Sequence, residues 1–565
     1  MVENNLIWFA SDMENGGQHC CIIPKMANRH GLIAGATGTG KSVTLKVLAD
    51  SFSDMGVPVF LADVKGDLAG MMKSGVDSAN MQERIARFGL SAAGFSYRPY
   101  PVTFWDLFGK NGIQLRTTIS EMGPLLLARL MGLNDLQSDI LTIAFKIADD
   151  NNLLLVDTKD LKALLNFVSE NAKDFSKDYG NLSPTSIATI IRAVVALELA
   201  GGETFFGETA LNISDWFTTD PNGRGMIHIL DSQSLISNTK LYSTFLLWLL
   251  SEMFETLPEV GDLEKPKMVF FFDEAHLLFK DAPKALVEKI EQVVKLIRSK
   301  GIGIYFVTQT PRDVPDSVLS QLGNKIVHGL RAYTPTDQKS VKAAADSFRV
   351  NPAFNTYETL QSLGTGEAVI SVLDEKGIPT VAQKVNILPP QSFMGSIDAE
   401  SRESAIKSSA LNEKYSVAFD PDSAYEFLSR RGMEAESPEE TQAPEVQPSV
   451  AAQPSVSPSP AVEEVNEAPA PSSRPMTKTE EFLMRKNAEK NAASASNAPK
   501  PAQQSARQPA KQSSSKSAGR SAVSSIGKEL GKSVGSSLGS VGKKVGGNLG
   551  SSLARGLFST LFSGK

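Results

Sequence analysis

A glycine-rich turn between two apolar segments is the first stretch of this sequence that indicates chemistry. Residues 35–42 read GATGTGKS, which matches the G-x-x-x-x-G-K-[ST] pattern of a phosphate-binding loop. Glycines let backbone N–H groups turn inward around a phosphate chain, and the following helix adds the positive end of its dipole. We expect Lys41 to reach the β- and γ-phosphates of ATP and Ser42 to ligate Mg²⁺. The predicted nucleotide contacts are Gly35, Ala36, Thr37, Gly38, Thr39, Gly40, Lys41, Ser42 and Val43.

A chance glycine turn is the alternative interpretation of this pattern. The context argues against it, because the turn follows the apolar stretch HGLIAG and opens the helix-like segment KSVTLKVLADSF. A strand, a glycine turn and a helix in that order are what a phosphate-binding loop requires.

An acidic pair follows a second apolar run, in the segment KMVFFFDEAH. The run is typical of a buried strand, and Asp273 and Glu274 stand at its end. We expect Asp273 to hold Mg²⁺ directly or through water, and Glu274 to polarise the attacking water. A solvated acidic turn is the alternative. The letters DEAH do not indicate the helicase class of that name, because the flanking motifs differ.

Three further polar residues complete the predicted catalytic group. Gln309 ends the apolar run IYFVTQT and is the candidate sensor of the γ-phosphate, with Thr308 the weaker candidate and ordinary turn chemistry the alternative. Hydrolysis also gains from a cation near the transition state, supplied across a subunit interface as an arginine finger. Arg298 and Arg331 are the two candidates, and a solvated surface charge is the alternative for each.

The elements that must position these residues alternate between strand-like and helix-like segments. Strands are predicted at PVFLADVKGD, GRGMIHILD, KPKMVFFFDEAH and IGIYFVTQT, with helices between them. This alternation predicts an α/β fold with a mainly parallel sheet. From 103 to 220 the pattern turns helical, which predicts a helical insertion.

Charge and cysteine usage limit the class of protein. The chain has a net charge of −6, but residues 481–565 carry +11, which leaves −17 for residues 1–480. An acidic body must confine any contacts with double-stranded DNA to a local channel, because DNA-binding bodies are usually basic. Cys20 and Cys21 are adjacent and unsuited to a disulfide, which favours a reducing, cytoplasmic compartment. No signal peptide is evident, and the apolar run STFLLWLLSEMF is too short to span a bilayer.

The composition divides the chain into four parts. Residues 1–395 are the predicted ATPase domain and 396–432 a C-terminal extension. Residues 433–520 are rich in Pro, Ala, Ser, Gln and Glu, which predicts a disordered linker. Residues 521–565 combine apolar residues at helical spacing with glycines every three to four residues, which indicates a basic tail that folds against itself, a partner protein, nucleic acid or a membrane surface. A flexible solvated tail is the alternative.

Taken together, these stretches resemble the HerA/FtsK branch of P-loop motor ATPases, and within it the bacterial HerA-like C-terminal ATPase family. The segments that carry the resemblance lie between about residues 10 and 390 and include GLIAGATGTGKSVTLKVLAD, KPKMVFFFDEAHLLF, RSKGIGIYFVTQTPRDVPDSVLSQLGN and HGLRAYTPTDQKSVKAAA. The resemblance implies a RecA-like core and a hexameric ring, with ATP between subunits and an arginine from the neighbour. Only about 30 residues precede the phosphate loop, too few for the N-terminal barrel of HerA, which weakens the expectation of a nuclease partner.

Three functions fit this sequence. The first is a ring ATPase that translocates double-stranded DNA. The second is a motor or switch ATPase that acts on a protein or envelope partner without DNA, tethered at the membrane periphery by its basic tail. The third is a nucleotide-binding scaffold with little turnover, which is disfavoured because it has no need of the water-activating Glu274.

Overall fold

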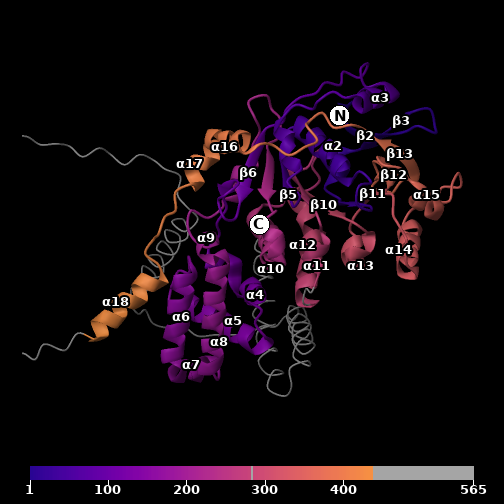
Figure 1. Ribbon diagram of the computed structural model, residues 1–565. Helices are drawn as coiled ribbons and strands as arrows, with labels where there is room; N and C mark the ends of the chain where they lie inside the picture. The colour runs from indigo at the N-terminus through magenta and orange to yellow at the C-terminus, as the bar shows by residue number, and fades with distance from the viewer. Residues whose placement is uncertain (281–283, 437–565) are drawn as a thin grey trace, which may run out of the picture. The chain divides into compact units, whose positions relative to one another are not determined.

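A computed structural model describes residues 1–280 and 284–436 of the chain (Figure 1). Contacts divide the chain into units of residues 1–478 and 479–565, and every described residue belongs to the first unit. The predicted linker, 433–520, begins inside the last described helix, which extends to Glu436. The rest of that linker and the predicted tail, 521–565, lie outside the described residues.

A single mixed sheet organises the described residues. Its order is β1-β2-β13-β12-β11-β4-β10-β9-β5-β8-β6-β7, with β3 paired to β2. Neighbours from β11 to β7 are parallel, whereas β12, β13, β2, β1 and β3 join antiparallel. The strands are β1 Val2–Glu3, β2 Leu6–Asp12, β3 Gln18–Ile22, β4 Gly31–Ala34, β5 Val59–Asp63, β6 Val102–Asp106, β7 Ile113–Gln114, β8 Ile227–Asp231, β9 Met268–Phe272, β10 Ile302–Thr308, β11 Asn324–His328, β12 Glu367–Ser371 and β13 Gln383–Ile387.

The central strands form because their apolar runs are buried on both faces. All five residues of β9 are buried, and so are all seven of β10. Side chains alternate across a strand, so Phe270 and Phe272 enter one hydrophobic core and Val269 and Phe271 the other. The predicted α/β fold with a mainly parallel sheet is confirmed, and β10 separates the phosphate-loop strand β4 from β9.

Helices cover both faces of this sheet. The core that contains Val269 also takes residues of α2, and the core that contains Phe270 takes residues of α10 and α12. The helix α10 is largely buried, which confirms that the run STFLLWLLSEMF forms a core helix. The helices are α1 Pro24–Ala27, α2 Lys41–Asp54, α3 Ala79–Arg87, α4 Ile119–Met131, α5 Asp135–Asp150, α6 Thr158–Glu170, α7 Ala172–Tyr179, α8 Pro184–Leu197, α9 Glu203–Phe205, α10 Thr239–Thr256, α11 His276–Phe279, α12 Lys284–Ile297, α13 Asp316–Leu319, α14 Pro335–Asp346, α15 Thr356–Ser362, α16 Ala399–Ser408, α17 Ala410–Tyr415 and α18 Ala424–Glu436.

The helical insertion is shorter than the predicted range of 103–220. Strand β7 and all but the first residue of β6 fall inside that range but belong to the sheet, where β6 pairs with β8 and buries Phe104 and Trp105. The helices begin after Thr118, whose hydroxyl caps α4 in a capping box with Glu121. Figure 1 shows α4 to α8 gathered together beside α10. The stretch Pro184–Phe205, which starts with α8, is long and apolar enough to cross a membrane by length and composition alone.

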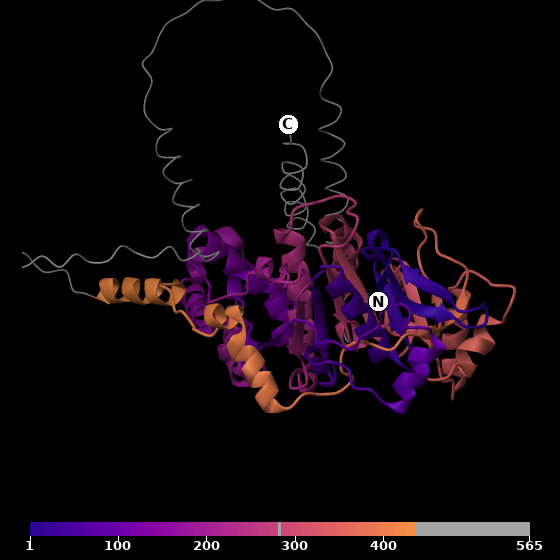
Figure 2. The same cartoon turned by 90° about the horizontal axis from the view of Figure 1, so that it is seen from above.

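The C-terminal extension, 396–432, packs against the sheet and the insertion. Just before it, the backbone N–H groups of residues 391 and 392 donate to the buried Asp50 of α2. On α16, Arg402 donates to Asp231 at the end of β8. Farther along, Ser423 donates to Asp160 of α6. In Figure 2 the orange extension runs past the sheet to the insertion helices, so it is an integral part of the folded body.

Candidate nucleotide-binding site

The predicted phosphate loop joins β4 to α2 at the carboxyl edge of the parallel strands. Gly38 and Gly40 have φ of +78° and +119°, in the left-handed region that favours glycine. Gly40 also lies against Gly366, because an added Cβ would come within 3.3 Å of the Gly366 Cα. The loop is anchored by its own N–H groups, since Gly35 donates to the carbonyl of Thr308 and Ala36 to that of Gly329. The loop that the pattern predicted is therefore formed and held by two neighbouring strands.

Lys41 begins α2 and curls back over the loop. Its ammonium donates to the carbonyls of Gly35 at 2.6 Å and Ala36 at 3.1 Å. Burial lowers the pKa of Lys41, and the nearby Lys65 ammonium lowers it further. Ser42 and Val43 follow in the first turn of α2 and are half-buried, while Thr37 and Gly38 at the tip of the loop are exposed. The residues that the motif named therefore form one continuous loop and the first turn of α2, with the Lys41 ammonium bound to the loop carbonyls.

The acidic pair stands at the end of β9, as predicted. Both carboxylates are buried, and the Asp273 carboxylate accepts from the backbone N–H of Glu274 at 2.9 Å. The hydroxyl of the buried Tyr242 donates to the Asp273 carbonyl. Burial raises the pKa of Asp273, whereas the Lys65 ammonium works in the opposite direction. A solvated acidic turn is thus excluded for this pair.

Glu274 is held in an uncommon backbone conformation. Its φ is +49°, which few residues other than glycine adopt, and such conformations concentrate at functional sites. The amide nitrogen of Gln309 lies 3.5 Å from its Oε2, and Nδ1 of His276 lies 3.3 Å from the same oxygen. Gln309 therefore reaches the acidic pair, whereas the Thr308 hydroxyl is engaged with Asp313 at 2.6 Å.

The oxygen donors of this site fit Mg²⁺ bound together with a nucleotide. Among the described residues no group of three or more His, Cys, Asp or Glu side chains is placed to hold a metal by itself. Mg²⁺ commonly takes one or two protein oxygens and completes its shell with phosphates and water. Ser42 and the Asp273 carboxylate supply such oxygens, and Asp273 and Glu274 contribute to the electrostatics of Lys41.

The two candidate arginines lie at opposite edges of the sheet. Arg298 precedes β10, at its amino end, and pairs with Asp262 at 3.3 Å. Arg331 follows β11 on the phosphate-loop edge and donates to the carbonyls of Gln361 and Leu363. The Arg331 side chain is exposed, whereas Arg298 is half-buried. Because β10 is seven residues long and only its last four residues pair with β4, its amino end is about 20 Å from the loop edge. Arg298 is therefore remote from the phosphate loop of its own chain.

Two residues of the site were not predicted from the sequence. Lys65, just after β5, places its ammonium 3.1 Å from Oε1 of Glu274 and 3.7 Å from Oδ2 of Asp273. His328, at the end of β11, lies beneath the loop, where its Nε2 is 2.8 Å from the Thr44 hydroxyl. Burial lowers the pKa of His328 to about 4, so the imidazole is neutral at physiological pH. The sequence signal that could have identified both residues is that each is a polar residue at the end of an apolar strand.

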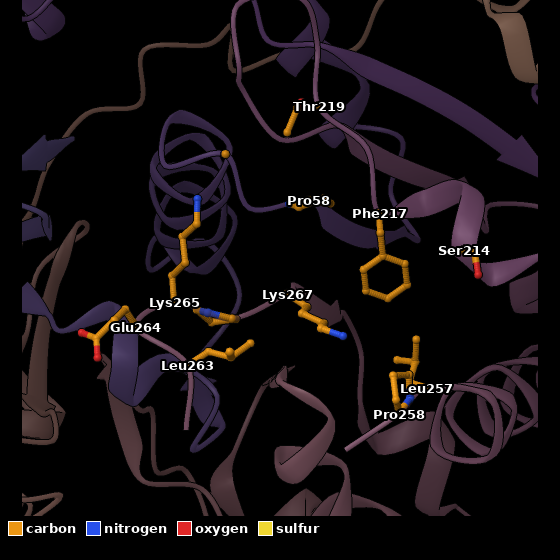
Figure 3. Close-up of a pocket in the computed structure, with 12 residues that line it drawn as sticks. Pro58, Ser214, Phe217, Thr219, Leu257, Pro258, Leu263, Glu264, Lys265 and Lys267 are labelled. Carbon is orange, nitrogen blue, oxygen red and sulfur yellow. The ribbon is translucent and has the colours of Figure 1, made fainter. Parts of the chain in front are cut away.

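A separate groove lies at the opposite edge of the sheet. It has a volume of about 640 Å³, and its lining comes mainly from the segments before β5 and β9 and after α10. Figure 3 shows Phe217 and Leu257 on one side of this groove, and Leu263 and Lys265 on the other. None of the predicted site residues lines it, so it is distinct from the nucleotide-binding site.

Comparison with known proteins connects this site to one family. A family model described as "Helicase HerA-like C-terminal" matches residues 10–565. The DNA double-strand break repair helicase HerA of Sulfurisphaera tokodaii is 24% identical over 355 residues, which cover 60% of this chain and 62% of that protein. The probable helicase MJECL08 of Methanocaldococcus jannaschii is 34% identical over 120 residues, which cover 20% of this chain and 21% of that protein. The match therefore spans less than two thirds of either relative.

A solved structure with a similar arrangement is that of the bacterial conjugative coupling protein TrwBdeltaN70. It is 16% identical, the alignment covers 67% of this chain and 89% of that chain, and the TM-score is 0.45.

Proposed function

Because this chain belongs to the HerA-like C-terminal helicase family, we propose that it is an ATP-hydrolysing ring motor that translocates on or unwinds double-stranded DNA. One observation carries the proposal. Lys41, the acidic pair and Gln309 come from three separate segments and meet at one edge of the sheet. A site that only bound nucleotide would need the loop but not the buried acids and the amide beside them.

Each residue has a defined role in this proposal. Lys41 leaves the loop carbonyls to meet the β- and γ-phosphates of ATP, while Ser42 and Asp273 hold Mg²⁺. Bound Mg²⁺ neutralises part of the phosphate charge. Glu274 orients the attacking water and accepts its proton, and Gln309 links that carboxylate to the γ-phosphate. Hydrolysis would then change the contacts of two neighbouring strand ends.

The proposed assembly is a homo-oligomer, a hexamer by family resemblance, with nucleotide between subunits. Arg298 is too far from its own phosphate loop to act there, so a role as the arginine finger requires the site of a neighbouring subunit. An arginine supplied from a neighbouring subunit raises hydrolysis by about 10³–10⁵ in related nucleotide hydrolases. The free thiols of Cys20 and Cys21 support a reducing, cytoplasmic location.

The test is steady-state ATP hydrolysis by the full chain, with and without linear double-stranded DNA, at low and moderate salt. The Glu274→Gln variant is the blank. Stimulation by DNA that fades as salt rises is expected for a motor that tracks the phosphate backbone. If the unmodified chain hydrolyses ATP at a rate that DNA does not change, and the Glu274→Gln variant does not hydrolyse it, the motor acts on a protein or envelope partner instead of DNA. Residues 521–565 would reach that partner. If the unmodified chain hydrolyses ATP no faster than the Glu274→Gln variant, the protein is a nucleotide-binding scaffold.

A further inference from the structure

Among the described residues, Lys65 forms ion pairs with both members of the acidic pair, and neither the sequence motifs nor the family comparison assigns it a role. It follows β5 at the same edge of the sheet as the phosphate loop. Its ammonium lies 3.1 Å from Oε1 of Glu274 and 3.7 Å from Oδ2 of Asp273. The side chains of Asp273 and Glu274 are only 8% and 11% exposed, so one lysine compensates two buried carboxylates.

Both carboxylate oxygens of Glu274 contact other side chains. Lys65 is at Oε1, while His276 and Gln309 are near Oε2. Both carboxylate oxygens are therefore engaged by protein groups. Each carboxylate oxygen can accept two hydrogen bonds, so the Lys65 ammonium occupies one of the acceptor positions at Oε1 that a water molecule could use.

Hydrogen bonds hold the backbone of the turn that carries Lys65, whereas its side chain is partly exposed. The Asp63 carboxylate accepts from the N–H groups of Gly66 at 2.7 Å and Leu68 at 3.1 Å. The buried Lys46 ammonium donates to the Asp67 carbonyl at 2.6 Å. The Lys65 side chain is 43% exposed, so rotation about its own stem is enough to withdraw the ammonium from the acids.

A cation in this position competes with a metal ion. If Asp273 ligates Mg²⁺ through Oδ2, the ammonium that now lies 3.7 Å from that oxygen repels the metal, which favours withdrawal of the ammonium. The same withdrawal releases Oε1 of Glu274. Entry of the metal and release of the base are thereby coupled through one side chain.

We propose that Lys65 is a positioning residue that occupies Asp273 and Glu274 in the nucleotide-free site and competes with Mg²⁺ for them. Lys65 thus sets the Mg²⁺ concentration at which the site becomes competent. This inference rests on the proposed function, since it requires that Mg²⁺ and ATP bind at this edge of the sheet.

The experiment measures binding rather than turnover. A fluorescent ATP analogue is titrated into the full chain across a series of Mg²⁺ concentrations, and the concentration for half-maximal metal-dependent binding is read. Lys65→Met keeps the length of the side chain and removes its charge, and Lys65→Arg keeps the charge. Lys73→Met is the matched control, because Lys73 pairs with the exposed Asp398 outside the site.

We expect Lys65→Met to reduce the Mg²⁺ requirement about tenfold, since one competing charge is removed. Lys65→Arg and Lys73→Met are expected to keep the requirement of the unmodified chain. If Lys65→Met fails to fold, Lys65→Gln replaces it with the same expectation. A Mg²⁺ requirement that is unchanged or raised in a folded, nucleotide-binding Lys65→Met protein overturns the inference. Absence of Mg²⁺-dependent binding in the unmodified chain would instead overturn the proposed function.

Discussion

The amide nitrogen of Gln309 lies 3.5 Å from Oε2 of Glu274, although 35 residues separate the two in the chain. The contact exists because β10 and β9 are parallel neighbours, so the residues that follow them meet at one edge of the sheet. A candidate γ-phosphate sensor and a candidate base are therefore directly connected. We expect a change in the contacts of Gln309, after β10, to alter the position of Glu274, after β9.

Replacing Glu274 with glutamine should separate binding from hydrolysis. The amide keeps the shape of the side chain but cannot accept a proton from water. We expect Glu274→Gln to bind the ATP analogue like the unmodified chain and to lose about 10²–10⁴ of its turnover. Titration with the ATP analogue measures binding, and phosphate release measures turnover. Turnover that survives nearly intact would show that another group activates the water.

Truncating Gln309 should affect turnover more than binding. Gln309→Ala removes the amide that connects the acid to the phosphate side, while Lys41 and the loop remain. We expect a loss of about 100-fold in kcat, the lower end of the range for removing one positioned polar group. The matched control is Gln338→Ala on the exposed surface of α14, which should retain full kcat. Equal kcat in both variants would contradict a sensor role for Gln309.

The arginine finger can be identified by mixing inactive variants. Arg298 is about 20 Å from the loop edge of its own sheet, so we expect it to serve a neighbouring subunit. Arg298→Ala alone should lose about 10³ in turnover. When mixed with Glu274→Gln it should recover part of the activity, because some interfaces then combine an intact arginine with an intact glutamate. Recovery by Arg331→Ala, and none by Arg298→Ala, would assign the finger to Arg331.

His228 makes stability depend on acid pH. Trp105 donates its indole N–H to Nδ1 of His228 at 3.1 Å, and Nε2 lies 3.1 Å from the Trp216 carbonyl. Burial lowers the pKa of His228 to about 4, from 6.5 in the unfolded chain. The folded state therefore favours the neutral ring. The contribution of this neutral ring to the free energy of unfolding is complete above pH 6.5 and is lost as the pH falls toward 4.

The comparison that isolates this residue uses His228→Asn, measured by urea unfolding at pH 7.5 and 5.5. The difference in free energy of unfolding between the two proteins should shrink by about 1.4 kcal/mol at the lower pH. His30 and His328, whose pKa values are also lowered to about 4, are present in both proteins and cancel. A difference that does not change with pH would contradict a neutral buried His228.

Removal of residues 437–565 should leave a folded body that binds ATP. The last helix of that body, α18, ends at Glu436, and the core takes Tyr415 and Ala424 from the extension. We expect the shortened chain to retain its urea midpoint and its affinity for the ATP analogue. Truncation after Ser409 is the contrasting variant, because it removes the buried Tyr415, whose hydroxyl donates to Asp215 at 2.5 Å. That second variant should be markedly destabilised. Aggregation of the chain that lacks residues 437–565 would show that the folded body extends beyond Glu436.

Local pattern was enough to predict the centre of the site. A phosphate loop is a short continuous motif, so its glycines, Lys41 and Ser42 are readable in one stretch. Asp273 and Gln309 each end an apolar run, and buried parallel strands place such ends at one edge of the sheet. The α/β fold followed from the same alternation of strands and helices. The start of the insertion was misplaced, because β6 is recognisable only through its pairing with β8.

The sequence by itself determined which residues are equipped for phosphate chemistry, since that depends on residue type and short spacing. Only the tertiary structure decided which cations accompany them, because contacts between distant strand ends depend on strand order. Lys65 belongs to the site only because β5 lies next to β9, and His328 only because β11 lies next to β4. Arg298 is excluded from its own phosphate loop for the same reason, since it stands at the opposite end of a strand that runs parallel to β4.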